Sequence, residues 1–270
     1  MHALSHHRMT RAFTSASLRP GGLKMGHFLH VDHFHMSEPT FPPHPHAGFS
    51  AVTWMLPWSR GGFVNRDSLG DRSRIVPGAL HWTLAGSGML HEEIPEVSGV
   101  DCEGLQIFVK LPEALEAMTP AAHHLAPGDV ATLERSGGTV RVLVGAVDGI
   151  ASPVPSHAGV TLLHIDLSDG DLELDVPKGL TAFAVVLRGT GAINQVPVRA
   201  DVAVALPSGA VPFAGAGMSA LVAWSDEMER QPTFAGPFCM FSQARLVAAR
   251  SAYAAGAMGR LEPSDVRWVR

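Results

Sequence analysis

The clearest structural signal in the sequence is the stretch Leu80-His81-Trp82-Thr83-Leu84-Ala85-Gly86-Ser87-Gly88-Met89-Leu90-His91-Glu92-Glu93-Ile94-Pro95. Two segments within it, Leu80–Leu84 and Met89–Ile94, have the length of β-strands and begin and end with apolar residues. Glycine and proline account for 28 and 20 of the 270 residues, and they separate short apolar runs throughout the chain. This punctuation predicts an all-β protein made of strands and turns.

Similar apolar runs continue on both sides of this stretch. The further strands that we predict are Phe49–Leu56, Ser73–Val76, Leu105–Lys110, Val140–Ala146, Thr161–Leu167, Leu172–Val176, Thr181–Arg188, Ala203–Leu206 and Ser219–Trp224. Glycine-containing turns such as Pro77-Gly78 lie between them. Many short strands at regular spacing are typical of barrels and sandwiches.

The segment Glu113–Arg135 breaks this pattern near the middle of the chain and contains Pro120 and Pro127. We interpret it as a linker between two all-β halves. The domains are accordingly placed at residues 1–118 and 119–270.

A helix is predicted near the C-terminus, over Gln243–Ala255. Ser242 is suited to cap its N-terminus, and Gly256 follows where a left-handed residue often ends a helix. We expect this helix to pack back and strap the two halves together. The side chains predicted to share one side of it are Leu246, Val247, Arg250 and Tyr253.

Charge and cysteine content exclude several classes of function. The net charge is -5 and no run of Lys and Arg occurs, so direct nucleic-acid binding is not expected. Cys102 and Cys239 are far apart, and we expect buried free thiols in a reducing compartment. Met1–Thr10 lacks the apolar stretch of a signal peptide, and no run approaches the roughly 20 residues of a membrane helix. We therefore expect a cytoplasmic protein without membrane contact.

Histidine is unevenly distributed along the chain. Eleven of the fifteen histidines precede residue 92 and none follows His164, so histidine chemistry is expected in the first half. In a strand, the pattern His44-Pro45-His46 places two imidazoles on one face. The same i, i+2 spacing places His91 and Glu93 on one face of a strand, and Glu92 on the other. If the two strands face each other across a barrel interior, three imidazoles and one carboxylate converge.

Three neutral imidazoles and one carboxylate can hold a divalent first-row transition metal and leave open positions on it. Fe(II) suits this set, and Mn, Co, Ni, Cu and Zn are alternatives because these ligands do not discriminate sharply. The absence of a thiolate argues against a closed structural zinc site. A single His-x-His is more often part of a solvated loop, and the repetition of the pattern is what favours a metal site.

A second histidine-rich run reads His27-Phe28-Leu29-His30-Val31-Asp32-His33-Phe34-His35. Its spacings of 3, 3 and 2 place its histidines on a single face of neither a strand nor a helix. We do not expect metal ligands here, and we regard His33 and His35 as candidates for a lid or for contacts to the ligands. His81, beside Trp82, is interpreted as a packed core histidine.

The ordered motifs of the chain resemble those of pirins. They are His44-Pro45-His46-Ala47-Gly48-Phe49, Arg66-Asp67-Ser68-Leu69-Gly70, Pro77-Gly78, the stretch 82–95, the segment 104–112 and Gly236-Pro237-Phe238-Cys239-Met240. The resemblance implies a bicupin, with two cupin (jelly-roll-type) β-barrels in tandem. It further implies one metal ion, iron, in the N-terminal barrel only, held by His44, His46, His91 and Glu93.

Two functions follow from this resemblance as alternatives. Some pirins are quercetin 2,3-dioxygenases, which implies an iron-dependent oxidoreductase that cleaves a flavonol-like substrate with dioxygen. Glu93 would then be the catalytic proton acceptor. Others are redox-sensitive regulators, which implies a non-enzymatic function through a partner protein. A metal-stabilised fold without activity is a third interpretation. For a dioxygenase, the apolar pocket walls are expected to be Phe49, Trp54, Trp82 and Met89.

Two positions depart from the pirin pattern. Pirins usually carry arginine after His-Pro-His and between the two glycines before the second metal motif, where this chain has Ala47 and Ser87. We therefore expect two positive charges to be missing near the mouth of the pocket. Their loss disfavours an anionic ligand or an acidic partner surface there.

Overall fold

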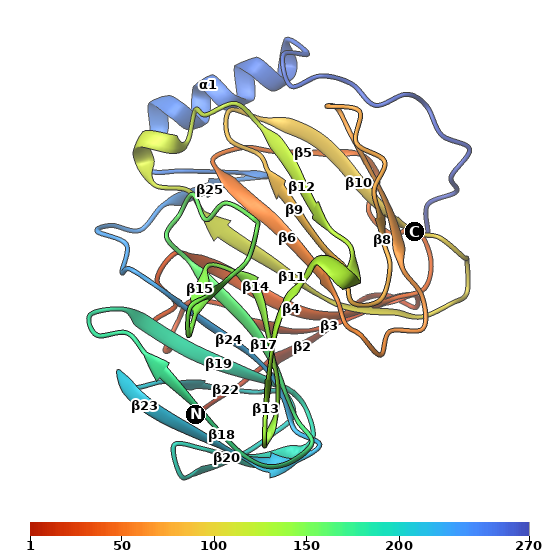
Figure 1. The fold of residues 1–270 in the computed structure, drawn as a ribbon. Coiled ribbons are helices and arrows are strands. Elements are labelled where there is room, and N and C mark those ends of the chain that lie inside the picture. The colour runs from red at the N-terminus through yellow and green to blue at the C-terminus, as the bar shows by residue number, and fades with distance from the viewer. Residues whose placement is uncertain (270) are drawn as a thin grey trace. The chain divides into compact units, whose positions relative to one another are not determined.

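The strand-and-turn sequence folds into two compact units in the computed structural model, which describes residues 1–269 (Figure 1). Unit 1 contains Met1–Ser5, Leu18–Leu29 and Asp129–Met228. Unit 2 contains His6–Ser17, His30–Gly128 and the described residues from Glu229 onward. Each unit is thus assembled from several segments, and the domain boundary between residues 118 and 119 stays a prediction.

Unit 2 is a jelly-roll-type barrel of two antiparallel sheets. The larger sheet has the order β12-β9-β6-β11-β4-β3-β2, with β2 at Ser5–Thr10, β3 at Phe13–Leu18, β4 at Phe28–Met36, β6 at Phe49–Met55, β9 at Leu80–Leu84, β11 at Cys102–Lys110 and β12 at Ala121–Leu125. The smaller sheet has the order β5-β10-β7-β8, with β5 at His44–His46, β7 at Phe63–Asp67, β8 at Arg74–Ile75 and β10 at Met89–Pro95. A hairpin of β25 (Thr233–Ala235) and β26 (Phe238–Met240) follows later in the chain.

Unit 1 repeats this arrangement. Its larger sheet has the order β1-β22-β19-β24-β17-β14-β13, with β1 at His2–Ala3, β13 at Ala131–Arg135, β14 at Gly138–Val144, β17 at Thr161–Leu167, β19 at Thr181–Arg188, β22 at Val202–Ala205 and β24 at Ser219–Ser225. Its smaller sheet has the order β18-β23-β20-β21, with β18 at Asp169–Val176, β20 at Thr190–Ile193, β21 at Val196–Arg199 and β23 at Gly209–Ala216. The short pair β15 (Ala146–Val147) and β16 (Ile150–Ala151) completes it. The core of unit 1 is apolar and includes Leu163, Phe213 and Val222. Two barrels of this kind with a C-terminal helix confirm the predicted fold class.

Strand β6 shows how the barrel interior of unit 2 is defined. All its residues are buried, because both faces of the strand are covered. Thr53 lies opposite His81 of β9 and Gln106 of β11 in the antiparallel registers, so these three side chains share one face. Trp54 lies on the other face. The interior of unit 2 is therefore partly polar.

The predicted C-terminal helix is confirmed as α1, over Gln243–Ala254, and it belongs to unit 2. The hydroxyl of Ser242 accepts a hydrogen bond from the backbone N–H of Arg245 at 3.3 Å, and Gly256 has φ +74°. The prediction that Leu246 and Val247 share one side of the helix is wrong, because Val247 is 53% exposed whereas Leu246 is buried. The buried face carries Leu246 and Ala249, which pack against a cluster that includes Ala47, Phe238, Met240 and Met258.

The predicted linker also differs from the structure. Glu113–Arg135 contains the 3-10 turns η1 (Glu113–Leu115) and η2 (Pro127–Asp129), together with the strands β12 and β13. Each strand pairs with a neighbour outside the segment, β12 with β9 and β13 with β14. Their strand conformation therefore depends on tertiary pairing, which the local sequence does not reveal.

Both cysteines are buried free thiols, as predicted. Burial raises the pKa of Cys102 and of Cys239 to about 12. Both thiols therefore stay protonated at neutral pH and are poor nucleophiles. Among the described residues, no helix combines the length and apolar character that crossing a membrane requires.

Candidate metal centre

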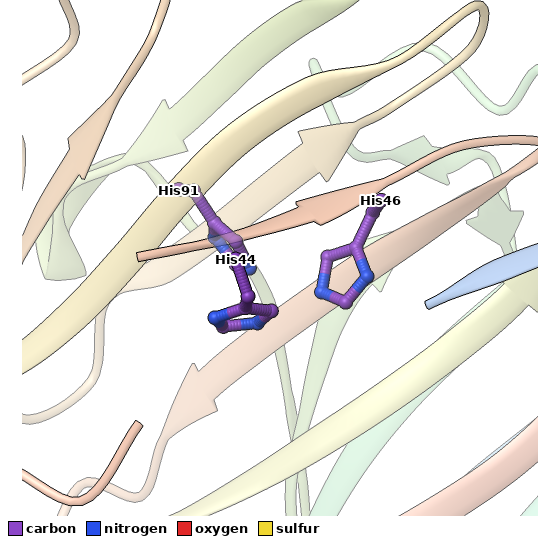
Figure 2. Close-up of side chains that lie close together, drawn as sticks. All are labelled: His44, His46 and His91. Carbon is purple, nitrogen blue, oxygen red and sulfur yellow. The ribbon is translucent and has the colours of Figure 1, made fainter. Parts of the chain in front are cut away.

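Strands β5 and β10 bring three histidines together in unit 2. Their antiparallel register places His44 opposite His91 and His46 opposite Met89. One ring nitrogen from each of His44, His46 and His91 lies within 4.8 Å of the others. The three rings are separated by 4.7 to 4.9 Å between centroids, and Figure 2 shows them turned toward one another.

The ring nitrogens of this cluster are prepared to accept an ion. His44 Nδ1 lies 2.9 Å from the carbonyl oxygen of Pro42, which can only accept, so Nδ1 carries the proton and Nε2 keeps its lone pair. His46 Nδ1 and His91 Nε2 are buried without a hydrogen-bond partner among the described residues. Burial lowers the pKa of all three histidines, that of His46 and His91 well below the usual value. Neutral imidazoles with unsatisfied buried nitrogens fit a metal ion.

Glu93 lies in the same pocket as the histidines, although its carboxylate is outside the group of nitrogens within 4.8 Å. The hydroxyl of Thr53 donates to the carboxylate and lies 2.8 Å from each oxygen. Burial raises the pKa of Glu93 to about 7, against the opposing effect of this hydrogen bond. Glu92 points elsewhere and pairs with Arg66 at 2.5 Å. The parity argument thus selects the glutamate that faces the pocket, while coordination by Glu93 stays a prediction.

The pocket beside the cluster has a volume of about 170 Å³ and mainly aromatic walls. Its apolar lining consists of Phe13, Phe34, Met36, Phe41, Phe63 and Phe108. The predicted walls were wrong, because Phe49, Trp54, Trp82 and Met89 do not line it. Trp54 and Trp82 alternate with the inward-facing Thr53 and Thr83 and therefore point to the opposite face of their sheet.

Four polar residues of the site were missed by sequence reasoning. His30, Asp32 and Gln106 line the pocket, and Thr53 contacts Glu93. The His30 ring lies 3.9 Å from that of Phe108 between centroids, and its Nε2 lies 3.7 Å from Asp32 Oδ2. The sequence contains no clear signal for them, because His30 and Asp32 lie on one face of β4 and His33 and His35 on the other, so polar residues do not alternate with apolar ones.

Ala47 and Ser87 lie beside α1 and do not line the pocket. Ala47 is fully buried in the cluster beneath the helix. Ser87 lines a separate cavity with Glu116 and Arg245, and these two side chains form an ion pair at 2.7 Å. These two positions therefore do not lie at the mouth of the pocket, and the expectation that positive charge is missing there is wrong.

Fold and site together define a bicupin with a candidate metal centre in one barrel. The chain belongs to the pirin family. A profile described as Pirin matches residues 6–109. Pirin-like protein 2 of Arabidopsis thaliana is 31% identical over 241 residues, which are 81% of this chain and 71% of that protein. For Pirin-1 of the same plant, the identity is 34% and the chain spans 56% of that protein's length.

Solved structures share this fold at low sequence identity. A quercetin 2,3-dioxygenase from Acinetobacter baumannii matches with a TM-score of 0.84 and 24% identity, over 95% of this chain and 96% of that one. The bacterial pirin YhhW from Escherichia coli, in complex with nickel(II), matches with a TM-score of 0.68 and 17% identity, over 83% and 96%. At these identities the likeness shows the fold alone.

Proposed function

We propose that unit 2 is a metal-dependent dioxygenase for a flavonol-like substrate of the quercetin type, with Fe(II) as the native ion. The observation that carries this proposal is the group of three neutral imidazoles, two buried and that of His44 half-buried, at one wall of an aromatic-lined pocket. Membership of the pirin family supports it, as does the quercetin 2,3-dioxygenase named among the structures of the same fold.

The ion would be held by His44, His46, His91 and Glu93. The histidines supply borderline nitrogen donors, and the carboxylate supplies negative charge without a thiolate, which suits a catalytic ion. Thr53 holds the Glu93 carboxylate in one orientation through its hydroxyl. A hydrogen-bonded ligand of this kind is the usual way in which a protein orients a metal site.

The aromatic walls favour a flat apolar substrate. The rings of Phe34 and Phe63 stack 5.5 Å apart, and those of Phe13 and Phe41 meet edge to face at 5.0 Å. Stacking against such rings adds to the gain from burying apolar area. Gln106 and other polar residues of the lining can hydrogen-bond the hydroxyls of a flavonol and fix its orientation.

Glu93 is the proposed proton acceptor. When bound, the ion supplies Lewis acidity that favours ionisation of an enolisable hydroxyl. A base in the protein must then take the proton, and Glu93 is placed to do so once it loosens from the ion. The pKa of about 7 belongs to the protein without the ion, and the positive charge of a bound ion would lower it. Thr53 also stabilises the ionised form by its hydrogen bond.

The test is aerobic loss of the quercetin absorbance by the iron-loaded protein. We expect turnover by the unaltered chain, and loss of both bound iron and turnover in His44→Ala. His157→Ala removes a histidine of unit 1 and should change neither. Equal turnover by His44→Ala would contradict the proposed centre. Bound iron without quercetin turnover would contradict the dioxygenase and leave the metal site standing.

A further inference from the structure

A second group of side chains that could hold a metal ion lies on the other face of the sheet that contributes to the pocket. His30, Asp32 and Phe34 of β4 line the pocket. Because side chains alternate along a strand, His33 and His35 point to the opposite face. The histidine-rich run is thus divided between the two faces of one sheet.

The neighbouring strand β11 contributes the acidic partner. Gln106 and Phe108 of β11 line the pocket, so Glu103 has the opposite parity and shares a face with the two histidines. One ligand atom from each of His33, His35 and Glu103 lies within 4.8 Å of the others. His33 Nε2 lies 2.9 Å from Glu103 Oε1, and the two imidazole centroids are 5.7 Å apart.

Several contacts hold these side chains in place. Asp101 Oδ2 lies 2.8 Å from His35 Nδ1, the carboxylate–imidazole contact that typically orients a metal-bound histidine. The backbone N–H of Glu103 donates to Ser59 Oγ at 2.9 Å, and the Trp58 side chain hydrogen-bonds the carboxylate. Burial would raise the pKa of Glu103, but the hydrogen bonds from His33 and Trp58 outweigh it and lower the pKa. The carboxylate is therefore ionised at neutral pH.

Two independent imidazole–carboxylate hydrogen bonds are the alternative interpretation of these contacts. Partly exposed contacts of this kind contribute little to stability, and they do not require two imidazoles and two carboxylates to converge. His33 and Glu103 are mostly buried, whereas His35 and Asp101 are 45% and 41% exposed, so an ion could enter from solvent. Two imidazole nitrogens and a carboxylate suit Zn²⁺, Co²⁺ or Ni²⁺.

We propose that His33, His35 and Glu103 form a second binding site for a divalent transition-metal ion, with Asp101 orienting His35. This site lies in unit 2 and shares no ligand with the candidate centre. It is independent of the proposed dioxygenase function.

Co²⁺ is the probe for a test on the full chain, by calorimetry and visible absorption at neutral pH. We expect two equivalents to bind the unaltered protein. Glu103→Gln keeps the side-chain size but removes the charge, and should weaken one equivalent at least tenfold while the other is unchanged. His33→Ala should have the same effect. His44→Ala should remove the other equivalent, so failure of either site is distinguishable from failure of the other.

Glu229→Gln is the matched control, because it removes one exposed carboxylate far in sequence from both groups. It should leave both affinities unchanged. The Co²⁺ ion that His44→Ala removes should still bind to the Glu103→Gln and His33→Ala variants. Its binding shows that these two variants are folded. A single equivalent in the unaltered chain, or a second one that is insensitive to both Glu103→Gln and His33→Ala, would overturn the proposal.

Discussion

Thr53 shows how one hydroxyl can prepare a metal site. It donates to the buried carboxylate of Glu93 and lies 2.8 Å from each of its oxygens. Thr53→Val keeps the shape and removes the donor. We expect Fe(II) affinity to fall about tenfold, the scale of losses when a contact to a metal ligand is removed. Competition with a fluorescent chelator measures the affinity.

Thr132→Val is the control for this substitution, because Thr132 lies in unit 1 and bonds a backbone carbonyl. It should leave the iron affinity unchanged. Unchanged affinity in Thr53→Val as well would show that Glu93 is not oriented by Thr53 for metal binding.

His164 in unit 1 gives a pH dependence of stability. The His164 side chain is fully buried, and its Nε2 lies 2.8 Å from Ser219 Oγ. Burial lowers its pKa, the positive charges of Arg141 and Arg188 add to this effect, and Asp166 opposes it. In the unfolded chain the pKa of His164 is near 6.5, so as the pH falls the unfolded chain binds a proton at a higher pH than the folded chain does. Stability is full above about pH 6.5 and falls as the pH decreases toward the folded pKa.

His164→Gln tests this linkage, because glutamine can keep a hydrogen bond to Ser219 but does not titrate. Urea unfolding at pH 7 and pH 5 gives the measurement. Between these pH values we expect the unaltered chain to lose up to about 2 kcal/mol more than the variant. Identical losses in both proteins would exclude His164 as the source.

At the level of elements, helix α1 is positioned by a narrow strip of small apolar residues. Leu246 is 1% exposed and Ala249 is 5% exposed, whereas Val247 is 53% exposed. Leu246→Ala should therefore destabilise unit 2 by about 2–5 kcal/mol, since it leaves a cavity in a packed cluster. The neighbouring substitution Val247→Ala should cost less than about 0.5 kcal/mol. Comparable losses in urea unfolding of the two variants would contradict this assignment of the buried face.

The elements differ in how far the sequence alone determines them. Strands β6, β9 and β10 were predicted because each is a short segment that starts with an apolar residue, contains further apolar residues and is bounded by glycine or proline. Strand β4 was not, because its polar residues face both sides of the sheet and hide the alternation. The three histidines were found from their i, i+2 spacing, and the structure brings them together. The expected arrangement of the strands was wrong, because β5 and β10 are paired neighbours in one sheet and do not face each other across the barrel. Parity along one strand could not show that Trp54 and Trp82 face away from the pocket, since both faces of β6 and β9 are buried.

On the scale of the whole molecule, the two units have the same sheet arrangement and different interiors. The core cluster of unit 1 is made of apolar side chains, whereas the interior of unit 2 contains Thr53, His91 and Glu93. Both groups of side chains that could hold a metal among residues 1–269 lie in unit 2. The uneven distribution of histidine had predicted this asymmetry. The polar interior costs unit 2 stability unless its buried nitrogens find a partner.

A metal ion should therefore stabilise the two units unequally. At a free metal concentration 100 times Kd, an ion that binds only the folded site adds about 2.7 kcal/mol, which corresponds to a hundredfold change in an opening equilibrium. Native-state hydrogen exchange should show this protection in β5 and β10 and leave β17 and β24 unchanged. A chelator should reverse the effect, and His44→Ala should abolish it. Equal protection of β10 and β24 would mean that the ion stabilises the chain as a whole, and no protection of β10 would mean that these histidines do not bind it.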